Sequence, residues 1–223
     1  MLSLIHISEP TRRTPISYAV FCLKKKIIYL ISPNKIYPKF YLDLKKVLDT
    51  GKVGIFQLRL KKYSLKQKII IGKKIHPICK KRGVKFLIND DPTLSKKLNA
   101  DGCHIGQKDM SITEARKIVG NKIVGVTCHN SINLAKAAIK RKADYIAFGA
   151  FFSTKTKKVK YKATIKIINK VKKLTKIPIV AIGGINISNY KKLLLNNVNL
   201  LAISGYVWNN KKYKPYKTIE KIK

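Results

Sequence analysis

The chain has 223 residues, of which 45% are hydrophobic, and its 49 Lys and Arg residues against 10 Asp and Glu residues give a formal net charge of +39. This length and apolar content suit one large domain with a full core. No apolar run reaches the roughly 18 residues of a membrane-spanning helix, so the composition argues against a transmembrane protein.

The positive charge has two interpretations. A nucleic-acid or anionic-membrane binder carries such an excess, and its binding would weaken steeply with added salt. Here, however, the excess is mostly lysine spread over predicted exposed helix faces, as in Lys61–Lys74 and Lys166–Lys176. Nucleic-acid binders more often gather Arg and aromatic residues on one arm or helix. We favour a compositional bias of the genome and keep nucleic-acid binding as the alternative from a different class.

Residues 1–26 differ in character from the rest of the chain. The segment has an Arg pair and two prolines, and an apolar stretch at 16–23 precedes Lys24-Lys25-Lys26. That stretch resembles a translated sequencing adapter, so we interpret residues 1–26 as a non-homologous segment, artefactual or disordered, which leaves the true start codon open. A transit peptide is the alternative. The predicted catalytic domain covers residues 27–223.

From Ile27 onward, short β-branched or apolar runs alternate with longer Lys-rich stretches of helical period. The predicted strands are Ile27–Ile31, Ile55–Leu58, Phe86–Ile88, Gly102–Ile105, Ile123–Val126, Tyr145–Phe148, Ile179–Ile182 and Leu200–Ile203. The clearest helical patterns between them are Leu65–Cys79, Ile132–Lys140, Ala163–Leu174 and Ser188–Leu195. In addition, Ser111 with Glu114 predicts a capping box at the start of a helix.

Strands this apolar suit a parallel sheet that is buried on both faces. Eight β–α repeats in fewer than 200 residues favour a closed (β/α)8 TIM barrel, a single α/β domain, over an open doubly wound sheet. In such a barrel, the chemistry takes place where the strands end and the following loops begin.

Four cysteines, Cys22, Cys79, Cys103 and Cys128, form no Cys-x-x-Cys pair and no metal-ligand spacing. We predict buried small side chains in a reducing compartment, and therefore a cytoplasmic protein. A Cys128 nucleophile beside His129 is a minor alternative.

Polar residues follow the second predicted strand. Alternation places Gln57, Arg59 and Lys61 on one face, where an Arg fork with a Lys point charge suits an anion such as a diphosphate. The alternative is a Lys-rich strand end facing solvent.

Acidic residues gather after the third and fourth strands. Of the ten acids in the chain, Asp90, Asp91, Asp101 and Asp109 lie in this short window. Neighbouring strands would bring Asp90 and Asp109 together, and one or two carboxylates suit Mg²⁺, which completes its shell with water and phosphate oxygens. Asp91, which precedes Pro92, is assigned mainly to capping a helix.

The remaining strand ends predict a second anion site. Thr127 could bond a substrate, while His129 is either a base or a structural histidine. Hydroxyls alternate with lysines in Thr154-Lys155-Thr156-Lys157-Lys158, which suits a phosphate. Gly183-Gly184 and Ser204-Gly205 come after the last two strands, where barrels commonly bind phosphate.

Taken together, these residues resemble the thiamine-phosphate synthase family. The motifs run from about Gly54 to Ser204 and comprise Gln57-x-Arg59-x-Lys61, Asn89-Asp90-Asp91, Ala100-Asp101-Gly102-x-His104-x-Gly106-Gln107-x-Asp109, Gly125-Val126-Thr127, Ala143-Asp144-Tyr145, Thr154-x-Thr156-Lys157, Ile182-Gly183-Gly184-Ile185 and Ile203-Ser204.

The resemblance implies an enzyme that joins hydroxymethylpyrimidine diphosphate to thiazole phosphate, releasing pyrophosphate and giving thiamine phosphate. It implies that the diphosphate is held by Gln57, Arg59, Lys61, Asn89 and Lys157, among which Arg59, Lys61 and Lys157 act in catalysis. It implies Mg²⁺ on Asp90 and Asp109, and the pyrimidine on Thr127. The thiazole phosphate would be held by Thr154, Thr156, Gly184, Ile203 and Ser204.

Two departures from the family pattern affect the loop after the sixth strand. It reads Gly149-Ala150-Phe151-Phe152-Ser153 where prolines often flank the aromatic residue, and Val159-Lys160-Tyr161-Lys162 replaces a small-residue pattern. The nearest rival function is a thiazole tautomerase on the same barrel, which would use a histidine at the His129 position. Asp109 and the full Thr154-x-Thr156-Lys157 loop favour the synthase.

Overall fold

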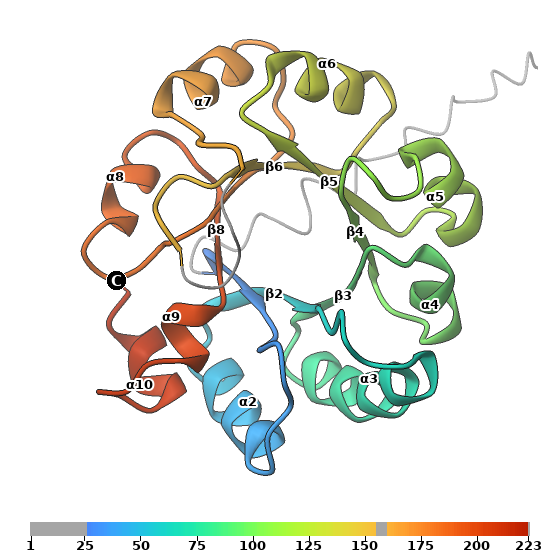
Figure 1. The fold of residues 1–223 in the computed structure, drawn as a ribbon, viewed down its shortest axis with the longest axis vertical. Helices are drawn as coiled ribbons and strands as arrows, with labels where there is room; N and C mark the ends of the chain where they lie inside the picture. The colour runs from blue at the N-terminus through green and yellow to red at the C-terminus, as the bar shows by residue number, and fades with distance from the viewer. Residues whose placement is uncertain (1–25, 155–159, 223) are drawn as a thin grey trace, which may run out of the picture.

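In the computed structural model, which describes residues 26–154 and 160–222, all eight predicted strands are present. They pair in parallel, each with the next and β8 with β1, and so close a barrel (Figure 1). The strands are β1 (Ile28–Ile31), β2 (Val53–Leu58), β3 (Lys85–Asn89), β4 (Gly102–Ile105), β5 (Ile123–His129), β6 (Tyr145–Gly149), β7 (Ile179–Ile182) and β8 (Leu200–Ile203).

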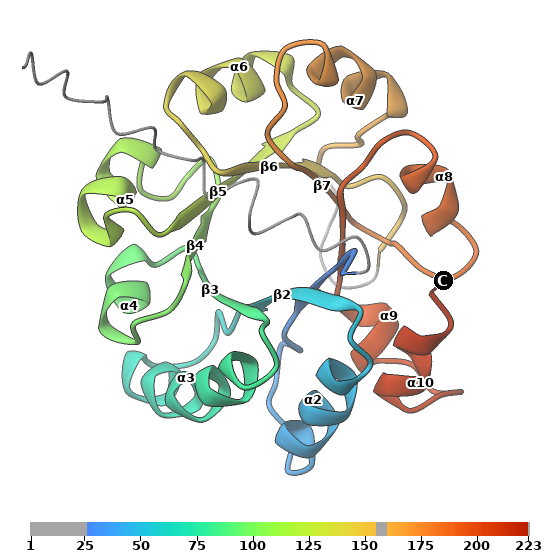
Figure 2. The same ribbon diagram turned by 180° about the vertical axis from the view of Figure 1, so that it is seen from behind.

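Helices surround the barrel, and both views down it show them outside the strands (Figures 1 and 2). They are α2 (Phe40–Asp49), α3 (Leu65–Lys80), α4 (Pro92–Lys97), α5 (Ile112–Val119), α6 (Ile132–Lys140), α7 (Ile165–Lys172), α8 (Tyr190–Leu194), α9 (Gly205–Trp208) and α10 (Pro215–Glu220). The predicted TIM-barrel fold is therefore confirmed.

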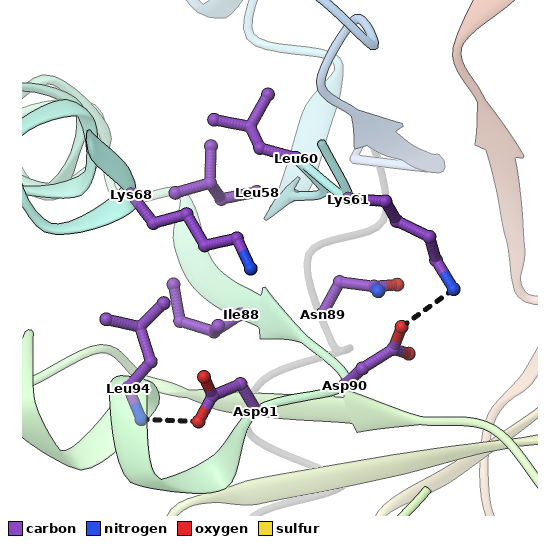
Figure 3. A pocket seen from close by; sticks show the side chains of 9 residues that line it. All are labelled: Leu58, Leu60, Lys61, Lys68, Ile88, Asn89, Asp90, Asp91 and Leu94. Carbon is purple, nitrogen blue, oxygen red and sulfur yellow. Dashed lines mark hydrogen bonds and ion pairs between the residues drawn. The ribbon is translucent and has the colours of Figure 1, made fainter. Parts of the chain in front are cut away.

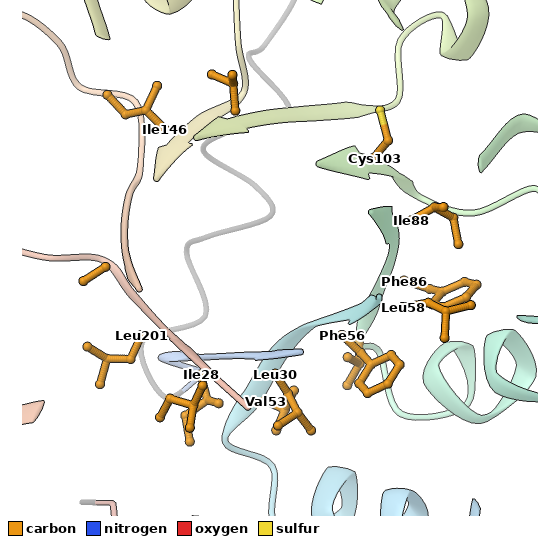
Figure 4. Packing of buried hydrophobic residues seen from close by; sticks show 14 of the residues in the cluster. Ile28, Leu30, Val53, Phe56, Leu58, Phe86, Ile88, Cys103, Ile146 and Leu201 are labelled. Atoms are coloured by element: carbon orange, nitrogen blue, oxygen red, sulfur yellow. The ribbon is translucent and has the colours of Figure 1, made fainter. Parts of the chain in front are cut away.

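Strand alternation divides the apolar residues into two cores. One set points outward and packs between strands and helices, as Leu30, Phe56 and Phe86 do (Figure 4). The other set fills the barrel interior and includes Tyr29 and Tyr145. Because both faces of every strand are covered, the strands read as continuous apolar runs in the sequence.

Several strands are longer than their apolar runs. β5 continues past Val126 through Thr127 to His129, with an irregularity in its pairing to β6 between these two polar residues. Likewise, β3 ends at Asn89 rather than at Ile88. Prediction from apolar runs stopped too early because backbone pairing does not depend on side-chain polarity.

Helix ends agree with the predicted caps. Ser111 and Glu114 form the predicted capping box of α5, and Asp91 caps α4 by accepting a hydrogen bond from the Leu94 backbone. Ser64 and Gln67 form a second capping box, at the start of α3, which was not predicted. The helical pattern predicted for 163–174 is shorter in the structure, where α7 covers Ile165–Lys172.

Other predictions concern cysteines, membrane spans and the first residues. Cys79, Cys103 and Cys128 are unpaired and buried, as predicted. No helix within the described ranges has the length and apolar character needed to cross a membrane. The predicted non-homologous segment lies, apart from Lys26, outside the described residues, as does Cys22.

Candidate active site

The first group of predicted site residues meets at the ends of β2 and β3. Gln57 is only 2% exposed although it is polar, because it points into the barrel. Its side-chain amide donates a hydrogen bond of 3.2 Å to the side-chain oxygen of Asn89. Two predicted ligands of one anion thus hold each other in place.

Arg59 is positioned by the segment after β1. Its backbone N–H donates to the Ser32 hydroxyl at 2.9 Å, and its guanidinium lies 3.5 Å from the side-chain oxygen of Asn34. Neither Ser32 nor Asn34 is among the predicted site residues. In the sequence, Ser32 is marked only by its hydroxyl directly after an apolar strand, a pattern too common to predict a functional residue.

Lys61 lies beside the predicted metal ligands. Its ammonium is 3.0 Å from the Asp90 carboxylate, an ion pair visible in Figure 3. Both residues line a cavity of about 350 Å³ between the ends of β2 and β3 and helices α3 and α4. Figure 3 also shows Lys68 of α3 directed into this cavity, and Asp91 turned away from the ion pair toward the start of α4. The predicted capping role of Asp91 is therefore confirmed, and the Asp90 carboxylate faces Lys61 instead.

The carboxyl groups of Asp90 and Asp109 lie close enough for each to shift the pKa of the other. Burial raises the pKa of Asp90, but the bonds from Lys61 and Asp109 outweigh it, so the pKa lies below its usual value. Burial and the neighbouring Asp90 carboxylate raise the pKa of Asp109, although the Gly106 N–H donates to it at 2.7 Å. The two neighbouring carboxylates therefore favour a cation between them, which would relieve the repulsion.

Thr127 lies on β5 opposite a histidine on β4. Its hydroxyl is 2.8 Å from Nε2 of His104, whose Nδ1 is 2.8 Å from the Tyr145 hydroxyl. The Gln107 side chain donates to the Thr127 carbonyl. His104 and Gln107 were quoted only as parts of a motif, and their spacing did not reveal that they contact Thr127.

The environment of His104 keeps its imidazole neutral. Burial lowers its pKa to about 4, and the nearby Asp90 carboxylate only partly opposes this. Both ring nitrogens are bonded to hydroxyl groups, and these contacts suit a neutral ring.

We expect His104 to make stability fall with decreasing pH, between its ordinary pKa of 6.5 and its folded value of about 4. Below pH 6.5 the imidazole binds a proton in the unfolded chain but stays neutral in the folded chain, so protonation stabilises the unfolded state and lowers the free energy of unfolding. The full effect is about 3 kcal/mol. Urea unfolding at several pH values in this range gives the free energy of unfolding as a function of pH, which should change less steeply for His104→Gln than for the unaltered chain. Equal pH dependences would contradict the lowered pKa of His104.

The second group of predicted residues lies at the ends of β7 and β8. Gly184 has a φ of +64°, and a Cβ there would lie 2.3 Å from the Ser153 carbonyl. Glycine is therefore needed for the approach of the β6–α7 loop as well as for any ligand. The Ser204 hydroxyl donates to the Ser32 carbonyl at 3.1 Å, which ties the end of β8 to the residue that holds Arg59.

The other predicted residues of this group differ in how they could reach a ligand. Thr154 is half-buried in the same loop, whereas Thr156 and Lys157 lie outside the described residues. Ile203 is 2% exposed and its side chain packs in the outer core, so it can reach a ligand only through its backbone.

The residues Cys128 and His129 do not form a nucleophile and base. Cys128 is fully buried, which raises the pKa of its thiol to about 12. The His129 ring stacks on Tyr161, with centroids 4.1 Å apart, so the altered loop residue contacts the histidine. The minor alternative of a thiol nucleophile is therefore excluded by burial.

A closed parallel barrel with cationic, carboxylate and hydroxyl groups at the carboxyl ends of its strands defines a TIM-barrel enzyme. The family described as thiamine monophosphate synthase matches residues 28–207. The chain belongs to this family. The implied family, the synthase function and its transferase class are thereby confirmed.

Similar proteins and a similar solved structure support the membership of this family. The thiamine-phosphate synthase of Pelagibacter ubique (strain HTCC1062) is 66% identical over 202 residues, covering 90% of this chain and 98% of that protein. The thiamine-phosphate synthase of Rhodospirillum centenum (strain ATCC 51521 / SW) is 40% identical, covering 82% and 89%. The thiamine phosphate pyrophosphorylase from Pyrococcus furiosus superposes with a TM-score of 0.79 at 27% identity, covering 89% of this chain and 94% of that one.

Proposed function

We propose that the chain couples hydroxymethylpyrimidine diphosphate with thiazole phosphate, forming thiamine phosphate and releasing pyrophosphate. The observation that carries this proposal is the carboxyl pair of Asp90 and Asp109 beside the Lys61 ammonium, in a barrel mouth that also holds Gly184 and Ser204. A site with cations and paired carboxylates on one side, and glycine and hydroxyl groups on the other, suits two phosphorylated substrates.

The diphosphate would lie on Gln57, Arg59, Lys61, Asn89 and Lys157. Support comes from the Gln57–Asn89 hydrogen bond and from the fixed backbone of Arg59, which pre-position donors before a ligand arrives. As the bond to the pyrimidine methylene breaks, negative charge collects on the leaving pyrophosphate. Arg59, Lys61 and Lys157 would stabilise that charge, which is why we assign them to catalysis. The overall positive charge would help attract both substrates.

The carboxyl pair fits a magnesium ion. Within the described ranges, no three His, Cys, Asp or Glu side chains gather closely enough to hold a metal by themselves. Mg²⁺ needs only one or two carboxylates when phosphate oxygens and water complete its shell. Asp90, whose pKa lies below its usual value, and Asp109, whose carboxylate is disfavoured by the neighbouring Asp90 charge, are therefore suitable ligands. Bound there, Mg²⁺ would neutralise charge on the leaving group.

The pyrimidine would contact Thr127, and the thiazole phosphate would lie on Thr154, Thr156, Gly184, Ile203 and Ser204. The Gly184 backbone and the Ser204 hydroxyl support a phosphate site, with Ile203 contributing only its N–H. Since the thiazole nitrogen itself attacks the pyrimidine methylene, the protein needs no nucleophile.

Incubation with both substrates and Mg²⁺ tests the proposal. We expect thiamine phosphate and pyrophosphate in equal amounts, and neither product when a chelator removes the metal. If the thiazole substrate alone is isomerised and no coupling occurs, the tautomerase is the correct function. If coupling proceeds fully in chelator, the metal assignment is wrong.

A further inference from the structure

The described part of the β6–α7 loop consists of an outgoing limb, residues 150–154, and a returning limb, residues 160–164. In the returning limb, the ring of Tyr161 stacks on the ring of His129 at an interplanar angle of 26°, with centroids 4.1 Å apart. Tyr161 is 52% exposed, so burial in the hydrophobic core does not fix its ring. It replaces part of the small-residue pattern of the family and makes a contact that a small side chain could not make. The proposed function gives this contact no role.

The backbone of His129 has an uncommon conformation. Its φ of +53° lies in the left-handed region, and the pairing of β5 with β6 is irregular between Thr127 and His129. A residue with a Cβ keeps such a conformation only where surrounding contacts hold it. The stack on Tyr161 is one such contact. Next to it, the Asn130 side-chain oxygen accepts a hydrogen bond from the Thr164 N–H at 3.4 Å, so the end of β5 is joined to the returning limb at two points.

The backbone of Tyr161 joins the two limbs of the loop. Its carbonyl accepts a hydrogen bond from the Ala150 N–H at 2.9 Å, and the Ala150 carbonyl accepts one from the Ala163 N–H at 2.8 Å. These two bonds form a short ladder directly after β6. A contact that fixes the Tyr161 ring therefore also fixes the outgoing limb at Ala150.

The outgoing limb leads to the proposed phosphate ligands. The backbone N–H groups of Phe151 and Phe152 donate to carbonyls at the end of β7 and directly after it, each at 3.1 Å. The Ser153 carbonyl then approaches Gly184 so closely that a Cβ there would lie 2.3 Å away. Thr154 is the next residue of the limb. A displacement of the returning limb would therefore be transmitted to Thr154 and Gly184.

We propose that His129 and Tyr161 are positioning residues whose stacked rings anchor the β6–α7 loop and so place Thr154 and Gly184 for the phosphate of the thiazole substrate. This rests on the proposed function, in which those two residues hold that phosphate. His129 acts through the face of its ring, so an aromatic ring without nitrogen atoms can replace it. This separates the anchor from the base that a thiazole tautomerase would need at the same position.

The anchor is tested first in the enzyme without substrate. Backbone hydrogen exchange, followed by NMR, reports on the N–H groups of Ala150 and Ala163, which pair the two limbs. Tyr161→Ala should speed their exchange about fivefold, the effect of one aromatic pair, whereas Tyr161→Phe keeps the ring and should not. As a control, Tyr213→Ala removes a ring that lies 4.4 Å from the Lys221 ammonium, and it should not change this exchange. Unchanged exchange in Tyr161→Ala would overturn the proposal.

Kinetics test what the anchor does for the reaction. Tyr161→Ala should raise KM for the thiazole phosphate about fivefold and leave KM for the pyrimidine diphosphate unchanged, and Tyr161→Phe should restore the lower value. His129→Ala and His129→Phe meet the same left-handed backbone, so their comparison isolates the ring. We expect His129→Ala to raise KM for the thiazole phosphate and His129→Phe to restore it.

The contradicting results are distinct. If His129→Phe lost coupling as fully as His129→Ala, the imidazole would act by its nitrogen atoms and the anchor would be wrong. Equal rises in both KM values for Tyr161→Ala would also refute the placement of the thiazole phosphate. Faster exchange in Tyr161→Ala, together with no thiamine phosphate from the unaltered enzyme, would support the anchor and refute the proposed function.

Discussion

Replacing Asp109 by Ala is expected to lower thiamine phosphate formation by about a thousandfold while leaving the barrel folded, as is typical when electrostatic stabilisation of a leaving group is lost. Asp109 is in a loop at the mouth and contacts Asp90, so its removal eliminates half of the proposed metal site without opening the core. Steady-state rates over a range of Mg²⁺ concentrations measure the loss, and circular dichroism checks the fold.

Two further variants separate charge from loop geometry. Asp109→Asn keeps a side-chain oxygen that can accept the Gly106 N–H, so it should hold the loop but lose most of the activity. Asp49→Ala removes an exposed carboxylate that pairs with Arg82, away from the barrel mouth, and should leave the rate unchanged. If Asp109→Asn were as active as the unaltered enzyme, the charge of Asp109 would have no part in the reaction.

Replacing Gly125 by Ala is expected to destabilise the barrel by about 3 kcal/mol and to reduce activity, because the new methyl group overpacks the interior. The added Cβ would lie 1.9–2.4 Å from three atoms of the Tyr145 ring. That ring cannot retreat without breaking its hydrogen bonds to Tyr29 and His104. Urea unfolding measures the stability, and steady-state rates measure the activity.

A double-mutant cycle identifies the cause of this loss. In a Tyr145→Leu background, the ring is absent and Gly125→Ala should cost much less than in the unaltered chain. Activity should not return in the double variant, since the hydroxyl that bonds Nδ1 of His104 is missing. Equal costs in both backgrounds would show that the methyl group clashes with something other than Tyr145.

Much of the fold was predictable because it depends on local patterns. Apolar runs with intervening helical periods located all eight strands, and Ser111 with Glu114 located a helix start. The two aspartates after β3 could also be told apart, since only Asp91 precedes a proline at a helix start. The ends of β3 and β5 were placed too early, because the polar residues Asn89 and Thr127 pair as strand while pointing into the mouth.

The site was predictable only in part. Gln57, Asn89, Asp90 and Asp109 stood out as polar residues at strand ends, and the structure brings them together in contacting pairs. Tyr29 and Tyr145, by contrast, lie within apolar strands and resemble ordinary core residues. Nothing local indicates that their hydroxyls meet each other and a histidine, since the partners are far apart along the chain.

The sequence by itself determined which segments alternate as strand and helix, and which strands end in polar side chains, because hydrophobic period and capping act over a few residues. Only the tertiary structure decided which of those side chains meet. Closure of β1 onto β8 and the register between neighbouring strands place Ser204 against Ser32, and His104 between Tyr145 and Thr127. Such contacts depend on the inward direction and the height of each residue in the barrel, which no single segment specifies.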